Sequence, residues 1–214
     1  MIKIDLHVHT RYSDGNGSID QVIKIARMKG LNAIAITDHD TTLGGLKAQR
    51  LASDIIVIPG YETATDAGHI LVLGVRKPLK TRNYVDLIEQ ARDCGAVTIL
   101  AHPVTGPLKM HKWSTVKPNA VEVINALYPL PRLQVFVSKL IAGKLGLPST
   151  GGSDSHEFST VGDAYTVVDS DMDYSSILEA LMKGQMAPLG SSTHFKIRLK
   201  FYINNIKYRS RFVL

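Results

Sequence analysis

Short apolar stretches alternate with polar turns and with helical apolar patterns along most of the chain. The apolar stretches predict strands at residues 1–10, 32–37, 55–58, 68–74, 96–101, 120–124 and 164–168. Apolar residues at helical spacing predict helices that begin at Ser18, at Thr41 or Thr42, near Arg82, at Pro131 and at Tyr174. The stretch at 32–37 is apolar at nearly every position, as expected of a strand that is covered on both faces.

The alternation of strand and helix, with short connections, indicates parallel strands joined by right-handed crossovers. Two architectures have this pattern, an open doubly wound sheet and a closed barrel. Histidines and acids follow nearly every predicted strand, which is typical of the carboxyl rim of a barrel. An open sheet would concentrate such groups at one switch point. The pattern therefore favours an α/β fold of the barrel type.

Two segments fall outside this alternation. Residues 104–118 show no clear periodicity, and loops of this length often act as lids or binding loops. In residues 195–203 the apolar positions fit both an edge strand and a helical stripe, so the sequence leaves that choice open. We therefore divide the chain into one domain at residues 1–190 and a basic tail at residues 191–214, which we expect to pack on the barrel or to contact a partner.

Composition narrows the class of protein. The 214 residues suffice for one sizeable core, and the hydrophobic fraction of 44% is typical of a soluble globular protein. No apolar run reaches the roughly 18–20 residues that span a bilayer, and no leader pattern precedes the first strand. Cys94 is the only cysteine, which excludes a disulfide within the chain and a thiolate metal cluster. These features predict a cytoplasmic protein.

The net charge of +6 belongs to the tail. Six of the 25 basic residues follow His194 and no acidic residue does, so the 19 other basic residues are balanced by the 19 acidic ones. A neutral domain gives no indication of binding to long nucleic acids, which are therefore less favoured as partners. The basic tail alone fits an anionic membrane surface or a nucleic acid.

The histidines and carboxylates at the strand ends have the chemistry of a metal site. His7 and His9 are two residues apart on a strand and therefore project to the same face. A barrel would bring seven further groups to the same rim, namely Asp14, His39, Glu62, His69, His102, Asp154 and His156. Imidazole with carboxylate suits Zn, Mn or Fe. Nine ligands are too many for one four-coordinate ion, so we expect two or three divalent ions that share a bridging carboxylate.

Short motifs contain these residues, in the order His7-x-His9, Ser13-Asp14-Gly15, Thr37-Asp-His39-Asp40, Gly60-Tyr-Glu62, His69, Ala101-His102-Pro103 and Gly152-Ser-Asp154-Ser-His156. In this order they resemble the PHP (polymerase and histidinol phosphatase) family. The resemblance covers roughly residues 1–190. It implies a distorted, TIM-like (β/α)7 barrel with a trinuclear metal site at the carboxyl rim of the strands and phosphoesterase activity.

The same resemblance assigns the ligands. It implies three ions, held in turn by His7, His9, Glu62 and Asp154; by Asp14, His39 and His156; and by Glu62, His69 and His102. Turnover would depend most directly on Asp14, His39, Glu62 and His156.

We therefore expect a hydrolase that cleaves phosphomonoesters, either nucleotides or small phosphorylated metabolites, by metal-activated water. Arg11, Asp40 and Lys109 are the residues that we expect to contact the substrate. One alternative is a phosphodiesterase or exonuclease acting on nucleic acid or oligonucleotides, since the same ions can promote attack on a diester. Another is a metal-binding regulatory domain without turnover. Amidohydrolase chemistry is disfavoured, because no lysine lies at a strand end where it would bridge the ions.

Overall fold

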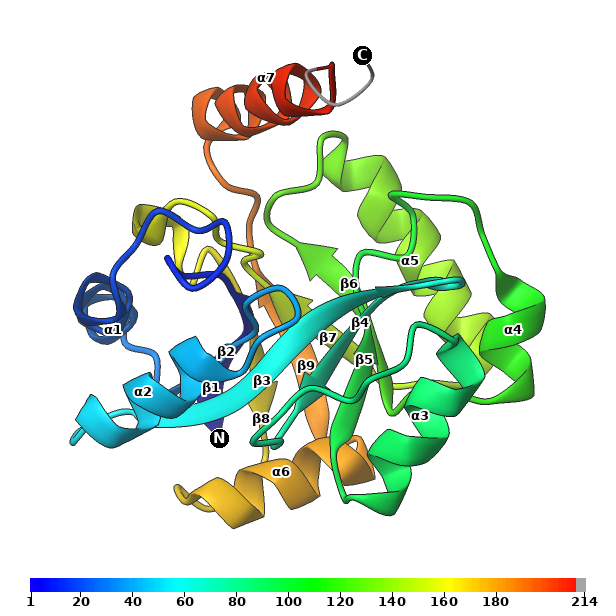
Figure 1. The fold of residues 1–214 in the computed structure, drawn as a ribbon, viewed down its shortest axis with the longest axis horizontal. Coiled ribbons are helices and arrows are strands. Elements are labelled where there is room, and N and C mark those ends of the chain that lie inside the picture. Colours follow the sequence, from blue (N-terminus) through cyan, green and yellow to red (C-terminus); the bar gives the residue numbers. More distant parts are fainter. Residues whose placement is uncertain (211–214) are drawn as a thin grey trace.

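The strands form one nine-stranded sheet that curves into a nearly closed barrel with helices around it (Figure 1). The computed structural model describes the backbone of residues 1–210 and the side chains of residues 1–203. The strands are β1 (Ile2–Val8), β2 (Ala33–Ile36), β3 (Ile56–Thr65), β4 (Gly68–Leu73), β5 (Val97–Leu100), β6 (Ala120–Asn125), β7 (Ser149–Gly152), β8 (Ala164–Val168) and β9 (Met186–Gly190). The expected barrel is confirmed, but with nine strands instead of seven. The sequence did not predict β7 or β9, because both lack the run of β-branched residues that marks a strand.

Seven α-helices are described: α1 (Ile19–Met28), α2 (Leu43–Leu51), α3 (Tyr84–Asp93), α4 (Met110–Thr115), α5 (Pro131–Leu145), α6 (Tyr174–Lys183) and α7 (Phe195–Ser210). A short 3₁₀ turn, η1, spans Phe158–Thr160. The start of α1 is fixed as its sequence predicts. Ser18 and Gln21 form a capping box, in which the side chain of each residue accepts a hydrogen bond from the backbone of the other. The apolar residues Val22, Ile23 and Ala26 are buried along one side of this helix.

The strand order is β7-β6-β5-β4-β3-β2-β1-β8-β9, and the sheet is mixed. The groups β1–β2–β3 and β5–β6–β7 are parallel, whereas β4, β8 and β9 pair antiparallel with their neighbours. The expectation of parallel strands throughout was wrong. Only Asp66 and Ala67 separate β3 from β4, and two residues can close a hairpin but cannot carry a crossover helix. Strand β3 also extends beyond the predicted end at Ile58, and it includes Glu62.

The barrel closes where the chain after β7 meets β1. The backbone N–H of His9 donates to the carbonyl of Ser155 at 3.0 Å, and Val8 forms a parallel bridge with Ser155. Glycine allows this close approach, because a Cβ atom on Gly152 would lie only 2.6 Å from the Cβ of His7. This seam places the chain segment of Asp154 and His156 beside that of His7 and His9.

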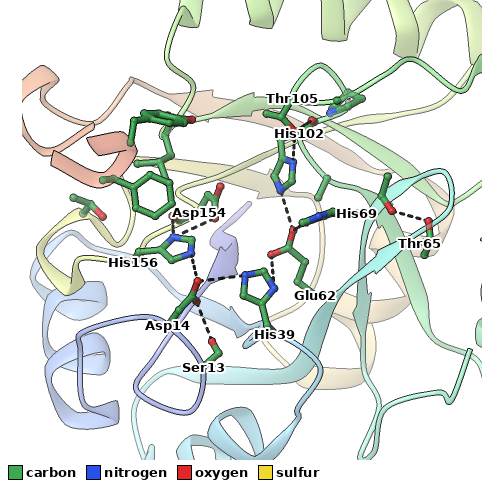
Figure 2. A pocket seen from close by; sticks show the side chains of 18 of the residues that line it. Ser13, Asp14, His39, Glu62, Thr65, His69, His102, Thr105, Asp154 and His156 are labelled. Carbon is green, nitrogen blue, oxygen red and sulfur yellow. Dashed lines mark hydrogen bonds and ion pairs between the residues drawn. The ribbon is translucent and has the colours of Figure 1, made fainter. Parts of the chain in front are cut away.

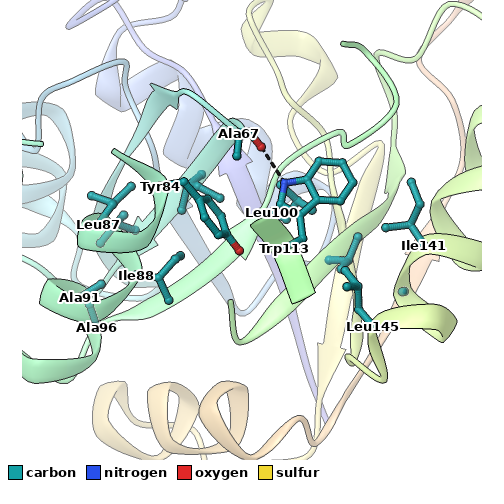
Figure 3. Close-up of a cluster of buried hydrophobic side chains, with 14 of the residues drawn as sticks. Ala67, Tyr84, Leu87, Ile88, Ala91, Ala96, Leu100, Trp113, Ile141 and Leu145 are labelled. Atoms are coloured by element: carbon teal, nitrogen blue, oxygen red, sulfur yellow. Dashed lines mark hydrogen bonds between the residues drawn. The ribbon is translucent and has the colours of Figure 1, made fainter. Parts of the chain in front are cut away.

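Helix α4 lies within the segment at 104–118 that was expected to be an irregular loop. It has only six residues, too few to show a helical period in the sequence. Trp113 anchors this helix in the core, with its indole N–H donating to the carbonyl of Ala67 at 2.7 Å (Figure 3). Its ring packs in a cluster that also includes Tyr84, Leu100 and Ile141. The segment is thus fixed to the barrel wall over part of its length.

Helix α7 settles the open choice for residues 195–203 in favour of a helix. It lies beyond the barrel, on the side where the candidate site opens (Figure 1). The side chain of Arg198 donates to the carbonyl of Thr193, and the hydroxyl of Tyr202 donates to the carbonyl of Leu127, which follows β6. Within residues 1–210, no helix has the length and apolarity that a membrane span requires.

Candidate metal centre

The nine predicted ligand side chains meet at one rim of the barrel (Figure 2). Most of them lie at the carboxyl ends of parallel strands or just beyond. His69 lies at the start of β4, but because β4 is antiparallel, its start lies at the same rim as the ends of β3 and β5. The hairpin therefore contributes a side chain that a crossover connection would have carried to the opposite rim.

Glu62 lies at the centre of this cluster and is only 1% exposed. Its Oε1 atom is 2.7 Å from Nδ1 of His69 and 2.9 Å from Nε2 of His102. Its Oε2 atom is 3.2 Å from the Nε2 atoms of both His7 and His9. The two oxygens of one carboxylate thus face two different sets of imidazoles, which is the arrangement that a bridging ligand requires.

Three groups of side chains have their donor atoms close enough to hold one cation each, with all atoms of a group within 4.8 Å of one another. The groups are His7, His9, Glu62 and Asp154; His9, Asp14, His39 and His156; and Glu62, His69 and His102. They match the three sets expected from the sequence, with His9 added to the second. The Nδ1 atom of His9 lies 3.6 Å from Asp14, whereas its Nε2 atom faces Glu62.

Several observations indicate that these groups are suited to bind divalent cations. The donors are imidazole nitrogens and carboxylate oxygens, a set that suits Zn, Mn or Fe. The Nδ1 atom of His9 is buried without a hydrogen-bond partner among the described residues, although buried polar atoms are normally satisfied. Figure 2 shows the side chains of His39, Glu62, His69 and His156 converging on one space. A cation in each group would satisfy these donors together.

The pKa values in the cluster follow from burial and from mutual attraction. Burial disfavours charge on His9, but the carboxylates of Asp154 and Glu62 outweigh it and raise the pKa of His9 to about 10. Burial also opposes ionisation of Glu62 and Asp154, yet the charge of His7 and hydrogen bonds from neighbouring imidazoles hold both pKa values well below their usual range. Without another cation His9 therefore keeps its proton, which a bound metal would displace.

A second set of side chains orients the first, and the sequence reasoning missed its main member, Glu122. This buried carboxylate accepts a hydrogen bond from Nδ1–H of His7 at 3.0 Å and another from the backbone N–H of His102 at 2.9 Å. It thereby turns Nε2 of His7 toward Glu62. The available signal was an acidic residue inside the otherwise apolar run of β6. Asn125, at the end of the same strand, donates to both Glu122 and Asp154.

Asp38 has a comparable role for the loop that carries Asp14. Its carboxylate accepts hydrogen bonds from the backbone N–H and the hydroxyl of Thr10 and from the hydroxyl of Ser13, at 2.7, 2.7 and 2.8 Å. These contacts fix the turn directly before Asp14.

Two of the candidate ligands have an unusual backbone. His102 has φ of 27° and Asp154 has φ of 52°, within the left-handed region that residues other than glycine rarely adopt. Backbone strain of this kind costs on the order of 1–3 kcal/mol and is concentrated at functional sites.

A cavity of about 1170 Å³ opens directly onto the cluster. Among the residues expected to contact a substrate, Lys109 lines this cavity. Arg11 and Asp40 are not among its lining residues. Arg11 donates instead to the carbonyl of Asn16, and Asp40 pairs with Arg82 and accepts from the hydroxyl of Thr63. The structure therefore brings the nine expected ligands and Lys109 together, but not Arg11 or Asp40.

The sequence is similar to those of several known proteins. The chain is 31% identical over 144 residues to the uncharacterized protein MJ1587 of Methanocaldococcus jannaschii, of which it covers 84%, using 59% of its own length. It is 38% identical over 81 residues to a phosphoribosyl 1,2-cyclic phosphate 1,2-diphosphodiesterase of Eggerthella lenta. It is 39% identical over 82 residues to a 3',5'-nucleoside bisphosphate phosphatase of Chromobacterium violaceum. These two matches use 34% and 35% of this chain and cover only 31% and 28% of the enzymes.

The fold is shared with a solved two-domain protein from Bacteroides vulgatus, described as containing a predicted PHP-like metal-dependent phosphoesterase. The TM-score is 0.75 at 22% identity, over 89% of this chain and 65% of that one. Two family models match the sequence itself, the PHP domain at residues 5–120 and the PHP-associated region at residues 137–186. The first alone covers more than half of the chain. The chain therefore belongs to the PHP domain family.

Proposed function

We propose that this protein is a metal-dependent phosphoesterase that hydrolyses phosphomonoesters of nucleotides or of small phosphorylated metabolites. The observation that carries the proposal is the set of three imidazole–carboxylate groups that border one open cavity. A regulatory domain without turnover would not need three adjacent groups beside a cavity of this size.

In this proposal the ligands are those of the three groups. His7, His9, Glu62 and Asp154 hold one ion, Asp14, His39 and His156 with His9 hold another, and Glu62, His69 and His102 hold a third. Divalent ions held there would make water a stronger nucleophile near neutral pH and offset the charge on the phosphoryl oxygens.

Hydrogen bonds within the protein orient the imidazole rings of the candidate ligands. Glu122 fixes the tautomer of His7 by accepting from Nδ1–H, and the carbonyl of Asp154 accepts from Nδ1–H of His156 at 2.9 Å. Asp14, His39, Glu62 and His156 line the cavity, and turnover would depend most directly on them. Lys109, also at the cavity, would attract its negative charge.

We also propose, from the sequence, that residues 1–190 form the functional domain, that the ions are Mn, Zn or Fe, and that the protein is cytoplasmic. Substrate contacts by Arg11 and Asp40 also stay predictions, and both residues have other partners in the structure.

A phosphodiesterase is the second candidate. The observation that favours it is the 38% identity, over 81 residues, to the cyclic phosphate diphosphodiesterase. The same ions would serve either ester, so the distinction depends on how the cavity binds the group beyond the phosphate.

The test measures phosphate release from mononucleotides, histidinol phosphate and sugar phosphates. It compares the unaltered protein with the His39→Ala variant, with and without added Mn²⁺. We expect release that requires the metal and falls at least about 100-fold in the variant, since loss of even an outer contact to a metal ligand costs 10- to 100-fold. His111→Ala is the matched control, because His111 is exposed on α4 and belongs to none of the three groups.

Full metal-dependent hydrolysis by His39→Ala would contradict the assignment of the second group. If no monoester is hydrolysed but bis-p-nitrophenyl phosphate is cleaved, the diesterase is favoured. If neither the monoesters nor the diester are hydrolysed while metal is bound, a role without turnover is favoured.

A further inference from the structure

Helix α7 forms one wall of the cavity, although it lies outside both matched family regions. Ile197, Lys200, Phe201 and Tyr202 line the cavity together with the candidate ligands. Two polar anchors hold this part of the helix in place. Arg198 donates to the carbonyls of Thr193 and Pro129, and Tyr202 donates to the carbonyl of Leu127. The wall is thus tied to the segment after β6.

Phe201, in this wall, packs against one of the candidate metal ligands. The centroid of its ring is 4.6 Å from that of His156, with a tilt of 52° between the planes. The same His156 has its Nε2 atom 3.2 Å from Oδ2 of Asp14 in the second group. A partly exposed aromatic ring therefore lies one side chain away from the place where a phosphate would bind.

The cavity is larger than a phosphate group needs. Its volume of about 1170 Å³ exceeds the roughly 300–1,000 Å³ typical of sites for small organic ligands. Two lysines, Lys109 and Lys200, line it from different elements, and neither forms an ion pair within residues 1–203. The walls therefore offer positive charge for an anion and an aromatic face for a planar group.

We propose that Phe201 stacks on the base of a nucleotide substrate, so that α7 makes the site selective for phosphate esters that carry a nucleobase. This inference rests on the proposed phosphoesterase function and specifies its substrate class. A base beyond the sugar of a nucleotide lies several ångströms from its phosphate, and Phe201 is offset from the metal groups on the side of His156. Stacking between a base and an aromatic ring tolerates any base, since every base has a π-face.

The experiment compares two ligands that differ only in the base, AMP and ribose 5-phosphate. We expect Phe201→Ala and Phe201→Leu to weaken AMP binding about 5- to 150-fold, the range typical of losing one stacked base, and to leave the binding of ribose 5-phosphate unchanged. The leucine variant keeps an apolar side chain on α7, so a parallel loss in both variants is due to the aromatic face. Phe195→Ala is the matched control, because Phe195 is on the same helix, is 62% exposed and does not line the cavity.

Two readouts separate this inference from the proposed function. If the metal-loaded protein does not hydrolyse AMP and ribose 5-phosphate, equilibrium dialysis of the radiolabelled ligands measures their affinities. If it does hydrolyse them, KM and kcat/KM from steady-state kinetics take the place of the affinities. Selective loss of AMP binding without any hydrolysis would support the role of Phe201 and overturn the phosphatase. Equal affinities of both Phe201 variants and the unaltered protein for AMP, or an equal loss for both ligands, would overturn the role of Phe201.

Discussion

Glu62 is almost fully buried and has histidines around both of its carboxylate oxygens. A buried carboxylate is costly unless positive charge compensates it. The imidazoles provide this charge when they are protonated, and divalent ions would provide it more strongly. The position of this one side chain therefore connects all of the histidines of the first and third groups.

A second single residue, Glu122, is expected to affect the affinity for metal ions. We expect Glu122→Gln to weaken metal binding about 10- to 100-fold, as is typical when a residue that orients a metal ligand is changed. The amide offers only one acceptor oxygen, whereas both carboxylate oxygens now accept hydrogen bonds, from His7 and from the backbone of His102. Competition with a chelator of known affinity measures the change.

Glu179→Gln is the matched control for this substitution. Glu179 is exposed on α6 and, among the side chains of residues 1–203, forms an ion pair only with Lys183, one turn further along the helix. It should bind metal as the unaltered protein does. Equal affinities for Glu122→Gln and the control would show that Glu122 does not position the ligands.

The sequence predicted which ligand residues would meet because strand ends converge at a rim, and a residue such as His39 directly follows an apolar run. The role of Glu122 was not predicted, because the pattern of a strand shows that a residue is buried but not which neighbour its side chain faces. Arg11 and Asp40 were expected at the cavity because they lie beside motif residues. Adjacency in sequence does not fix the direction of a side chain, and Asp40 turns toward Arg82 instead.

At the scale of elements, the β3–β4 hairpin changes both the sheet and the site. The apolar pattern of residues 68–74 predicted a strand but contained nothing about its direction. Direction is set by the two-residue connection, which forces an antiparallel pair. The hairpin is also what brings His69 within reach of Glu62.

Helix α4 supports this hairpin, which gives a prediction about stability. Trp113 is 1% exposed and donates to the carbonyl of Ala67 in the hairpin turn. We expect Trp113→Ala to lower the free energy of unfolding by about 3–5 kcal/mol, through the cavity that it leaves. Urea unfolding followed by far-UV circular dichroism measures this, since the variant lacks the only tryptophan.

Phe136→Ala serves as the comparison. Phe136 is 60% exposed on α5, and its loss should change stability by no more than about 0.5 kcal/mol. A Trp113→Ala variant as stable as this one would mean that α4 contributes little to the core.

At the scale of the whole molecule, the barrel and α7 have separate roles. The barrel gathers the candidate ligands at one rim, and α7 covers part of the space above them. The family resemblance predicted the barrel because the motifs lie within it. The pattern of residues 195–203 fitted strand and helix equally well, so neither the helix nor its position at the cavity could be predicted.

We propose that the three groups hold divalent cations at this rim. Anomalous difference density from crystals grown with Mn²⁺ would locate such ions. We expect density within each occupied group, at about 2.0–2.3 Å from its imidazole nitrogens and carboxylate oxygens, with Glu62 between two of the peaks. Absence of density among these side chains at saturating Mn²⁺, or density only elsewhere on the protein, would show that the three groups do not form a metal centre.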